Sequence, residues 1–429
     1  MGWTGPWSPC WQAEHAPDVS NRALLSEPFA LTNGFKIPNR LAKAALSEGL
    51  ATRHGSPGAR IQRLYQRWAD NGMGLTITGN VMIDRRHGLG EPGNVVVEDD
   101  RDLADLQAWA RIIKSGGSAA FAQINHPGRQ SPRTLIAHPV APSAVQIEGM
   151  VGAFAKPREL TDGEIRDLIQ RWATAARILV EAGFDGVQIH GAHGYLISQF
   201  LSPLTNQRTD EWGGTPEKRM RFVLKVFRAI RAEVGPAVPV AIKLNSADFQ
   251  KGGFTENESL AVVHALAAEG LDLLEVSGGT YTSAAMLGVD DSLRESTRKR
   301  EAYFLKYAER VRAELPDLPL MLTGGFRTAD GMADAVASGA IDIVGLGRPV
   351  TVSPDFPGEL LGGRTDESIV NPRRSGIKLI DNLTELTYYT VQMWRMADGK
   401  EPAPRRHPAV NVTRYMIANG IGSIRSPRG

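Results

Sequence analysis

Eight short apolar runs, each followed by a longer segment with helical periodicity, constrain the fold of this chain more than any other feature. The runs are LAKAAL near residue 41, GLTITG near 74, AAFAQI near 119, GVQIH near 186, VAIKL near 240, LLEVS near 273, LMLTGG near 320 and DIVGLG near 342. Continuous apolar runs are typical of parallel strands that are covered on both faces. Eight alternations predict an α/β fold, a (β/α)8 TIM barrel, with a doubly wound sheet as the alternative.

The segments between the runs carry signals for helix starts and stops. In TDGEIRDLIQRWATAARILVEAG, Thr161 and Glu164 form the pattern of a capping box, and apolar residues follow at helical spacing. In TPEKRMRFVLKVFRAIRAEVG, Pro216 stands at an early helical position and Gly235 at a C-cap position. Both segments are therefore predicted to be helices that cover the sheet.

A length of 429 residues allows either one elaborated barrel or two domains. Because no linker separates two halves, we predict one barrel domain over 26–402, preceded by an extension (1–25) and followed by a basic, solvated tail (403–429). The segment from His126 to Leu160 is rich in Pro and Gly and follows the third run. It predicts a hairpin or lid over the mouth of the barrel, and the region beyond Asp355 forms a C-terminal extension.

Charge and cysteine content exclude several classes of protein. The formal net charge of +2 provides no broad basic field for nucleic acid. The single cysteine, Cys10, excludes an intrachain disulfide and every metal or iron–sulfur site that needs several cysteines. No run of about 18 apolar residues and no signal-peptide pattern occurs. We therefore expect a cytoplasmic protein that has no membrane partner; its oligomeric state, homo-oligomers included, stays open.

Polar residues stand where the strands end, and in a barrel all strand ends of one side share a single mouth. They are Ser47, Thr78, Gly79, Gln123, His190, His193, Lys243, Ser277, the TGG of 323–325 and the GLGR of 345–348. Glycine turns after the seventh and eighth strands leave backbone N–H groups free, and an arginine beside them adds a cation. These turns predict a phosphate site at Gly324, Gly325, Gly347 and Arg348, and tight barrel turns are the alternative interpretation.

Two histidines in HGAHGY, His190 and His193, allow three interpretations. A zinc site needs further ligands, and the chain offers neither a nearby cysteine nor an H-E-x-x-H pattern. Ordinary packing of one histidine is the second interpretation. In the third, two imidazole N–H groups bind one substrate oxygen and stabilise its developing negative charge, with Tyr195 as a proton donor nearby.

One glycine motif does not fit the function that it suggests. GLGEPG at 88–93 matches G-x-G-x-x-G, but Pro92 lies inside it and NVVVEDD follows in place of a helix. The strand-to-helix context of a dinucleotide site is missing, so we interpret this match as chance.

The longest motif, HGAHGYLISQFLSPLTNQRTDEWGGTPEKRMRF, resembles the signature of the old yellow enzyme family of FMN-dependent oxidoreductases. NRLAKAALSEGLA, AQINHPGR, APSA and the GG and GLGRP turns support the resemblance, which runs from about Ser26 to about Pro402. It implies a noncovalent FMN across the barrel mouth and NAD(P)H as the reductant, without a metal. Relatives with an iron–sulfur cluster carry a cysteine group and extra domains, so the resemblance is to the single-barrel type.

The resemblance also implies roles for the residues at the strand ends. His190 and His193 match the pair that holds a carbonyl or nitro oxygen, and Tyr195 matches the proton donor. Gln123 matches the amide at the flavin's pyrimidine edge, and Lys243 stands where an arginine usually faces flavin N1 and O2.

Other matched positions concern the rest of the cofactor and the substrate. Ser47 falls where the family has Thr or Cys near the flavin C4 oxygen, whereas Ala44 and Ala45 replace a common Ser-Pro. Gly79 and Gly324 join the expected cofactor contacts, and Gly325, Gly347 and Arg348 match the phosphate site. Substrate specificity is expected from Tyr281 and from the insert between Arg129 and Pro157.

The implied activity is that of an ene-reductase, similar to NADPH dehydrogenases, which reduces the activated C=C bond of an enone or a nitroalkene. Hydride would pass from the flavin to Cβ, and a proton from Tyr195 to Cα. Two alternatives stay open on sequence alone. One is a (β/α)8 isomerase or lyase that acts on a phosphorylated substrate, and the other is a flavin-binding protein without turnover.

Overall fold

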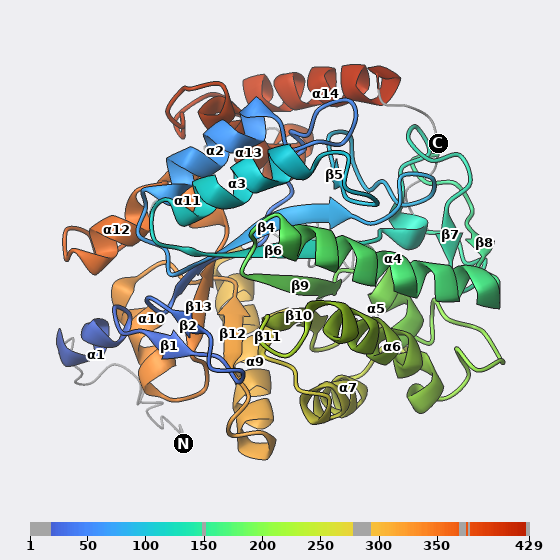
Figure 1. The fold of residues 1–429 in the computed structure, drawn as a ribbon. Coiled ribbons are helices and arrows are strands. Elements are labelled where there is room, and N and C mark those ends of the chain that lie inside the picture. Colours follow the sequence, from blue (N-terminus) through green and yellow to red (C-terminus); the bar gives the residue numbers. More distant parts are fainter. Residues whose placement is uncertain (1–18, 148–151, 278–292, 369–374, 376–377, 426–429) are drawn as a thin grey trace, which may run out of the picture.

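The computed structural model describes residues 19–147, 152–277, 293–368, 375 and 378–425, and eight parallel strands in this part of the chain close into a barrel (Figure 1). The strands are β3 (Leu41–Lys43), β4 (Leu75–Met82), β6 (Ala119–Asn125), β9 (Gly186–Gly191), β10 (Val240–Asn245), β11 (Leu273–Ser277), β12 (Leu320–Thr323) and β13 (Ile343–Leu346). Strand β3 pairs with β13 on one side and with β4 on the other, which closes the sheet. The predicted TIM barrel is confirmed, and the doubly wound alternative is wrong.

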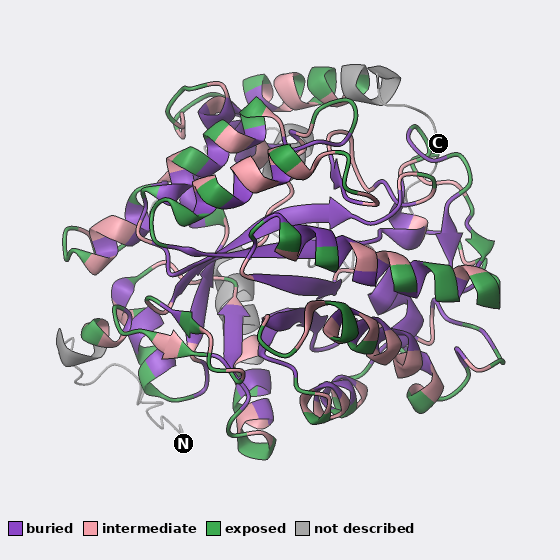
Figure 2. Cartoon of the chain, in the orientation of Figure 1, coloured by how far each residue is buried: buried purple, intermediate pink, exposed green. Residues whose placement is uncertain are grey.

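One helix follows each barrel strand and covers the outside of the sheet (Figure 1). In chain order these are α2 (Ala59–Ala69), α3 (Leu103–Lys114), α4 (Asp162–Glu181), α6 (Pro216–Val234), α7 (Glu256–Ala268), α9 (Leu293–Glu314), α10 (Ala329–Ala337) and α13 (Lys378–Ala397). In Figure 2 the strands are buried along their length, whereas the helices are exposed on their outer faces. This burial on both faces is why the strands read as continuous apolar runs.

The predicted helix caps are present. The hydroxyl of Thr161 accepts from the backbone N–H of Glu164, and the Glu164 carboxylate accepts from the backbone N–H of Thr161 at 2.9 Å. Helix α6 starts with Pro216 and ends at Gly235, whose φ of 77° is left-handed. These local signals set the helix ends without help from the tertiary fold.

A small hairpin packs against the first residues of the barrel strands. Strands β1 (Phe29–Ala30) and β2 (Lys36–Ile37) pair antiparallel, and Ile37 is fully buried. The ring of Phe35 lies 6.1 Å from the ring of Phe121 in β6. Apolar side chains from β3, β4, β6, β10, β11, β12 and β13 join this cluster. They fill the barrel at the end where its strands begin, opposite the mouth formed by the carboxyl ends of the strands.

The insert after β6 is built from short elements. It contains a 3-10 turn, η1 (Gly128–Gln130), and two short strands, β7 (Val140–Ala141) and β8 (Arg158–Glu159). Strands β7 and β8 pair in parallel, so the chain crosses over between them, whereas Pro132 and Phe154 form an antiparallel bridge within the same insert. Residues 148–151 of the insert lie outside the described part of the chain.

The C-terminal region is more ordered than the expected solvated end. Helix α14 (Pro408–Arg425) packs along α13, where the rings of Trp394 and Tyr415 stack with centroids 5.6 Å apart. Arg414 pairs with Asp398 at 2.7 Å, and Asn411 is fully buried. A stacked ring pair and an ion pair thus hold α14 against α13.

The remaining elements are short. They are α1 (Val19–Leu24), β5 (Val95–Val96), α5 (Leu196–Leu201), α11 (Arg348–Val352) and α12 (Phe356–Leu361). Arg22 of α1 pairs with Asp330 at 2.6 Å, which attaches the start of the described chain to α10. None of the helices in the described ranges has the length and apolarity needed to cross a membrane.

Candidate active site

A cavity of about 90 Å³ opens where the barrel strands end. Nine residues line it: Ala45, Leu46, Ser47, Asn80, Gln123, His190, His193, Tyr195 and Lys243. Six of these were predicted as site residues, and they come from four separate segments of the sequence. The barrel brings them together because the carboxyl ends of its parallel strands meet at one mouth. Asn80, near the end of β4, is a lining residue that the sequence did not single out.

His190, His193 and Tyr195 form a compact group on one wall of the cavity. The ring of His190 lies 5.1 Å from that of His193 and 4.8 Å from that of Tyr195, with both pairs edge to face. His193 has a left-handed backbone (φ 60°), which is uncommon for a residue other than glycine. This turn directs all three side chains of HGAHGY to the cavity.

Two glutamines hold that turn in place. The amide nitrogen of Gln199 donates to the carbonyl oxygens of Gly194 at 2.7 Å and Pro127 at 2.9 Å. The amide nitrogen of Gln130 donates to the carbonyl oxygen of His193 at 2.9 Å. Gln199 lies in α5 and Gln130 in η1, so the insert and the HGAHGY turn support each other.

Both histidines are neutral in the folded protein. Burial lowers the pKa of His193 to about 3, and burial followed by the electrostatic effects of the neighbouring His193 and Lys243 lowers the pKa of His190 well below its usual value. The Ala192 N–H donates to Nδ1 of His190 at 3.2 Å, so the proton of the neutral ring is on Nε2. Nε2 of His193 bonds the Ser277 hydroxyl at 2.8 Å, which leaves Nδ1 as its other polar atom.

Gln123 and Lys243 are linked beneath the cavity by two residues that the sequence analysis missed. Gln123 donates to Gln188 at 2.7 Å, Gln188 donates to Glu275 at 2.7 Å, and the Lys243 ammonium lies 2.8 Å from Glu275. Gln188 and Glu275 are fully buried within the apolar runs GVQIH and LLEVS. A carboxylate in the middle of a buried strand was the available signal, since an unpaired charge there would be too costly.

The Ser47 hydroxyl lies on the β3 side of the cavity and accepts from the Asn80 amide at 3.0 Å. Burial raises the pKa of the neighbouring Glu91 to about 7, against the opposing effect of the Ser47 hydroxyl. Oδ1 of Asn80 is buried and has no hydrogen-bond partner among the described residues. An orphaned acceptor in a cavity wall is a feature that a bound ligand can satisfy.

The predicted phosphate residues also come together. Gly324 and Gly325 have positive φ values of 141° and 74°, and they directly follow the strand pair in which Thr323 faces Gly345. Gly347 and Arg348 follow β13, and the exposed Arg348 guanidinium lies 5.1 Å from the ring centre of Tyr389. The turns thus lie side by side at the ends of β12 and β13.

Two other predicted residues are placed differently. Gly79 does not line the cavity; its N–H donates to Glu48 at 3.0 Å and to the Tyr65 hydroxyl at 3.1 Å. Tyr281 lies outside the described residues. Within the described residues, no three His, Cys, Asp or Glu side chains gather where they could hold a metal ion.

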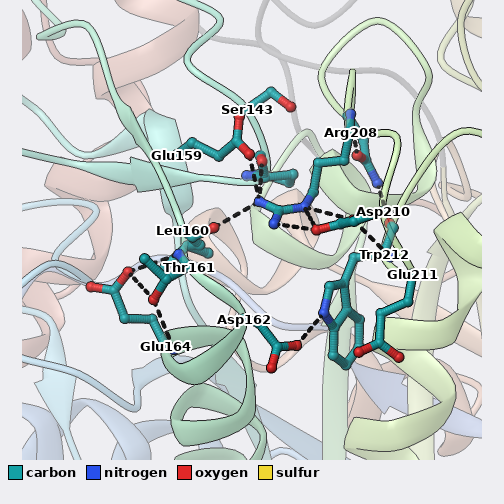
Figure 3. Close-up of polar contacts among 12 residues, drawn as sticks. Ser143, Glu159, Leu160, Thr161, Asp162, Glu164, Arg208, Asp210, Glu211 and Trp212 are labelled. Atoms are coloured by element: carbon teal, nitrogen blue, oxygen red, sulfur yellow. Dashed lines mark hydrogen bonds and ion pairs between the residues drawn. The ribbon is translucent and has the colours of Figure 1, made fainter.

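The tail of the long signature, SPLTNQRTDEWGG, has a scaffolding role that its sequence does not reveal (Figure 3). The Arg208 guanidinium donates to the carbonyl oxygens of Pro142 at 2.9 Å and Leu160 at 2.7 Å, and pairs with Asp210. The indole N–H of Trp212 donates to Asp162 in the first turn of α4 at 2.7 Å. These contacts attach the insert to the segment that carries Tyr195.

Residues 24–367 match the NADH:flavin oxidoreductase / NADH oxidase family. The chain is 38% identical to the NADH-dependent flavin oxidoreductase iliE of Hypocrea jecorina, over 77% of this chain and 87% of that protein. It superposes on an old yellow enzyme homologue from Zymomonas mobilis with a TM-score of 0.67 and 27% identity, covering 80% of this chain and 94% of that one. For 2-naphthoyl-CoA reductase the TM-score is 0.72 at 27% identity over 80% of this chain, which spans only 53% of that longer protein.

The family match and the relatives identify this barrel as a flavin-dependent oxidoreductase that uses a nicotinamide reductant. The chain belongs to the NADH:flavin oxidoreductase / NADH oxidase family, and old yellow enzyme homologues are among its structural relatives.

FMN is the cofactor of this family, and the residues present fit it. The cavity offers an amide at Gln123, an ammonium group at Lys243, a hydroxyl at Ser47 and the orphaned Asn80 acceptor. These groups can bond the polar edge of a flat heterocycle, and the glycine turns with Arg348 can hold a phosphate.

Proposed function

We propose that this enzyme uses NAD(P)H to reduce the activated C=C bond of α,β-unsaturated carbonyl or nitro compounds. One observation carries the proposal: two neutral imidazoles and a tyrosine line the same cavity as Gln123 and Lys243. Such a cavity can bind a substrate oxygen on one wall and the flavin's polar edge on another. When bound, FMN supplies the hydride chemistry, taking a hydride from NAD(P)H and passing one to the substrate.

The histidines bind and polarise the substrate oxygen. Nε2–H of His190 is a donor because Nδ1 of that ring accepts from the Ala192 N–H. When the Ser277 hydroxyl donates to Nε2 of His193, the proton of that ring is on Nδ1 and forms a second donor. Two fixed donors stabilise negative charge that develops on a carbonyl or nitro oxygen, a contribution typically of about 10²–10³ in rate for one donor.

Tyr195 delivers the proton to Cα. Its side chain is mostly buried, and its ring packs edge to face against His190. This contact supports the role, because Tyr195 lines the same cavity as the two histidines. A positioned general acid contributes roughly 10²–10⁴ in rate.

We assign the remaining predicted residues to cofactor binding. Gln123, Lys243 and Ser47 would hold the polar edge of FMN. Gly324, Gly325, Gly347 and Arg348 hold the phosphate. Gly79 supports the site indirectly, because its N–H is bonded to Glu48 and Tyr65 and a Cβ there would lie 1.9 Å from the Glu48 carboxylate.

The test is turnover by purified, FMN-loaded protein under anaerobic conditions. We expect yellow protein that releases FMN on denaturation and oxidises NADH or NADPH when an enone, a maleimide or a nitroalkene is added. FMN-loaded protein that is reduced by nicotinamide but is reoxidised by none of these acceptors would disprove the proposal and favour a flavin protein without this turnover. Conversion of phosphorylated sugars by colourless protein would favour the isomerase or lyase.

A panel of enones against variants of the insert tests where specificity lies. Substitutions between Arg129 and Pro157, and at Tyr281, should change the ranking of substrates and leave the reduction of FMN by nicotinamide unchanged. The same panel with both nicotinamides determines the preferred reductant.

A further inference from the structure

A buried carboxylate, Glu275, joins two residues that are assigned to the flavin's polar edge. Gln123, Gln188, Lys243 and Glu275 come from the adjacent strands β6, β9, β10 and β11. In the pairing of these strands Gln123 faces Gln188, and Lys243 faces Glu275. Both middle residues, Gln188 and Glu275, are 0% exposed, so water cannot replace their bonds. Two hydrogen bonds and one ion pair therefore connect the four side chains in a row beneath the cavity.

The charge of Glu275 fixes the direction of the hydrogen bonds in this row. An ionised carboxylate only accepts hydrogen bonds, so Gln188 must turn its NH₂ group to Glu275 and its oxygen to Gln123. Gln123 must then donate its own NH₂ group to Gln188, as observed at 2.7 Å. The carbonyl oxygen of Gln123 is left as an acceptor, which suits a donor such as the N3–H of a flavin. A neutral residue at 275 that can donate a hydrogen bond would allow Gln188 to donate to Gln123 in place of accepting from it.

Glu275 also balances the charge of Lys243. Their N–O distance of 2.8 Å in a buried position makes them a close ion pair. A second buried lysine, Lys43, bonds the carbonyl oxygens of Ala44 at 3.1 Å and Ile77 at 2.8 Å. Without Glu275, Lys243 would present an uncompensated positive charge to the cavity.

We propose that Glu275 is a positioning residue that orients the Gln123 amide toward FMN and, by pairing with Lys243, weakens the preference of the site for reduced over oxidised FMN. The inference deepens the proposed function and rests on its assignment of Gln123 and Lys243 to the flavin. Reduced flavin carries negative charge near N1, so an unopposed cation favours it. Glu275 therefore keeps the flavin a stronger hydride donor.

The principal test is the flavin midpoint potential of Glu275→Gln, measured on the FMN-loaded protein by dye-coupled titration. The substitution keeps the size of the side chain and removes its charge. We expect reduced FMN to bind at least tenfold more tightly relative to oxidised FMN, which raises a two-electron potential by about 30 mV. Glu275→Asp, which retains the charge, should shift the potential less than Glu275→Gln.

A matched variant separates the effect of the Glu275 charge on Lys243 from the effect of Glu275 on the orientation of the Gln123 amide. Gln188→Met breaks the link between Glu275 and Gln123 and leaves the ion pair with Lys243 intact. It should weaken the binding of oxidised FMN at least tenfold, measured by quenching of FMN fluorescence, with a smaller change in potential than Glu275→Gln.

In Glu275→Gln, loss of the proton from the unpaired Lys243 would hide the expected shift in potential. A second pair of proteins removes this ambiguity. Arginine stays charged when buried, so Lys243→Arg is compared with Lys243→Arg/Glu275→Gln. The double variant should have the higher potential.

The outcomes distinguish this inference from the proposed function. Wild-type protein that binds FMN, together with unchanged potentials in Glu275→Gln and in the double variant, overturns the inference and leaves the ene-reductase proposal standing. Wild-type protein that cannot be loaded with FMN overturns both. If Glu275→Gln does not fold, Gln188→Met alone decides the question. Unchanged FMN affinity of Gln188→Met then refutes the proposal that Glu275 orients Gln123 through Gln188.

Discussion

The neutral state of His193 predicts a measurable loss of stability in acid. In the unfolded chain the pKa of a histidine is about 6.5, and in the folded protein burial lowers that of His193 to about 3. As the pH falls, the unfolded state therefore binds the proton first. The stability of the folded state that depends on neutral His193 is fully present above pH 6.5 and is lost as the pH falls toward 3. A pH of 5.0 lies about 1.5 units below the pKa of the unfolded histidine. At about 1.36 kcal/mol per unit, the free energy of unfolding falls by about 2 kcal/mol.

The variant His193→Asn removes the titrating ring with little other change. Asparagine tolerates the left-handed backbone found at this position (φ 60°), and its amide can still bond Ser277. We expect the free energy of unfolding in urea to fall between pH 7.5 and pH 5.0 by about 2 kcal/mol less in the variant than in the wild type. His138→Asn, at an exposed histidine, is the control and should fall by as much as the wild type.

Groups away from His193 contribute equally to both proteins and cancel in this comparison, and burial lowers the pKa of His190 in both. Burial lowers the pKa of His126 to about 4, which also costs stability in acid, whereas the raised pKa of Glu91, about 7, favours the folded state as the pH falls below 7. An identical pH dependence in wild type and His193→Asn would show that His193 is not held neutral by burial, and the assignment of an uncharged donor pair would be wrong.

Four further variants test the site and its scaffold. Tyr195→Phe should slow reoxidation of the flavin by an enone roughly 10²–10⁴-fold in stopped-flow measurements and leave reduction by NADPH unchanged; equal slowing of both half-reactions would contradict its role as the acid. His190→Ala should weaken the binding of phenolic ligands, which resemble an enolate, by tenfold or more in a spectral titration, on the order of one lost charge-assisted hydrogen bond; unchanged affinity would count against the donor pair. Gly345→Ala places a Cβ 1.9 Å from the Thr323 hydroxyl, so the thermal unfolding midpoint should fall by the equivalent of about 1–3 kcal/mol, and an unchanged midpoint would mean that the strands separate easily. Arg208→Lys loses the forked contact with Asp210 and two carbonyl groups and should destabilise the insert by about 2 kcal/mol, seen as faster proteolysis there; equal rates of cleavage would argue against this anchor.

The sequence determined the elements of this fold because their signals are local. Each barrel strand is buried on both faces, so its apolar run needs no knowledge of its neighbours to be recognised. Thr161 with Glu164, and Pro216 with Gly235, set helix ends through contacts within a few residues. Once eight strands are counted, barrel closure brings the ends of distant strands together, which is why the cavity contains six of the predicted residues.

The tertiary structure alone decided how those residues are connected. Whether Gln188 meets Gln123, or Ser277 meets His193, depends on the register of adjacent strands and on a turn after β9, neither of which is local in sequence. The same holds for the parallel pairing of β7 with β8, which a Pro- and Gly-rich insert does not reveal. Glu275 shows the limit most clearly: the sequence places a carboxylate in a buried strand, and only the folded barrel supplies the lysine and glutamine that make it stable there.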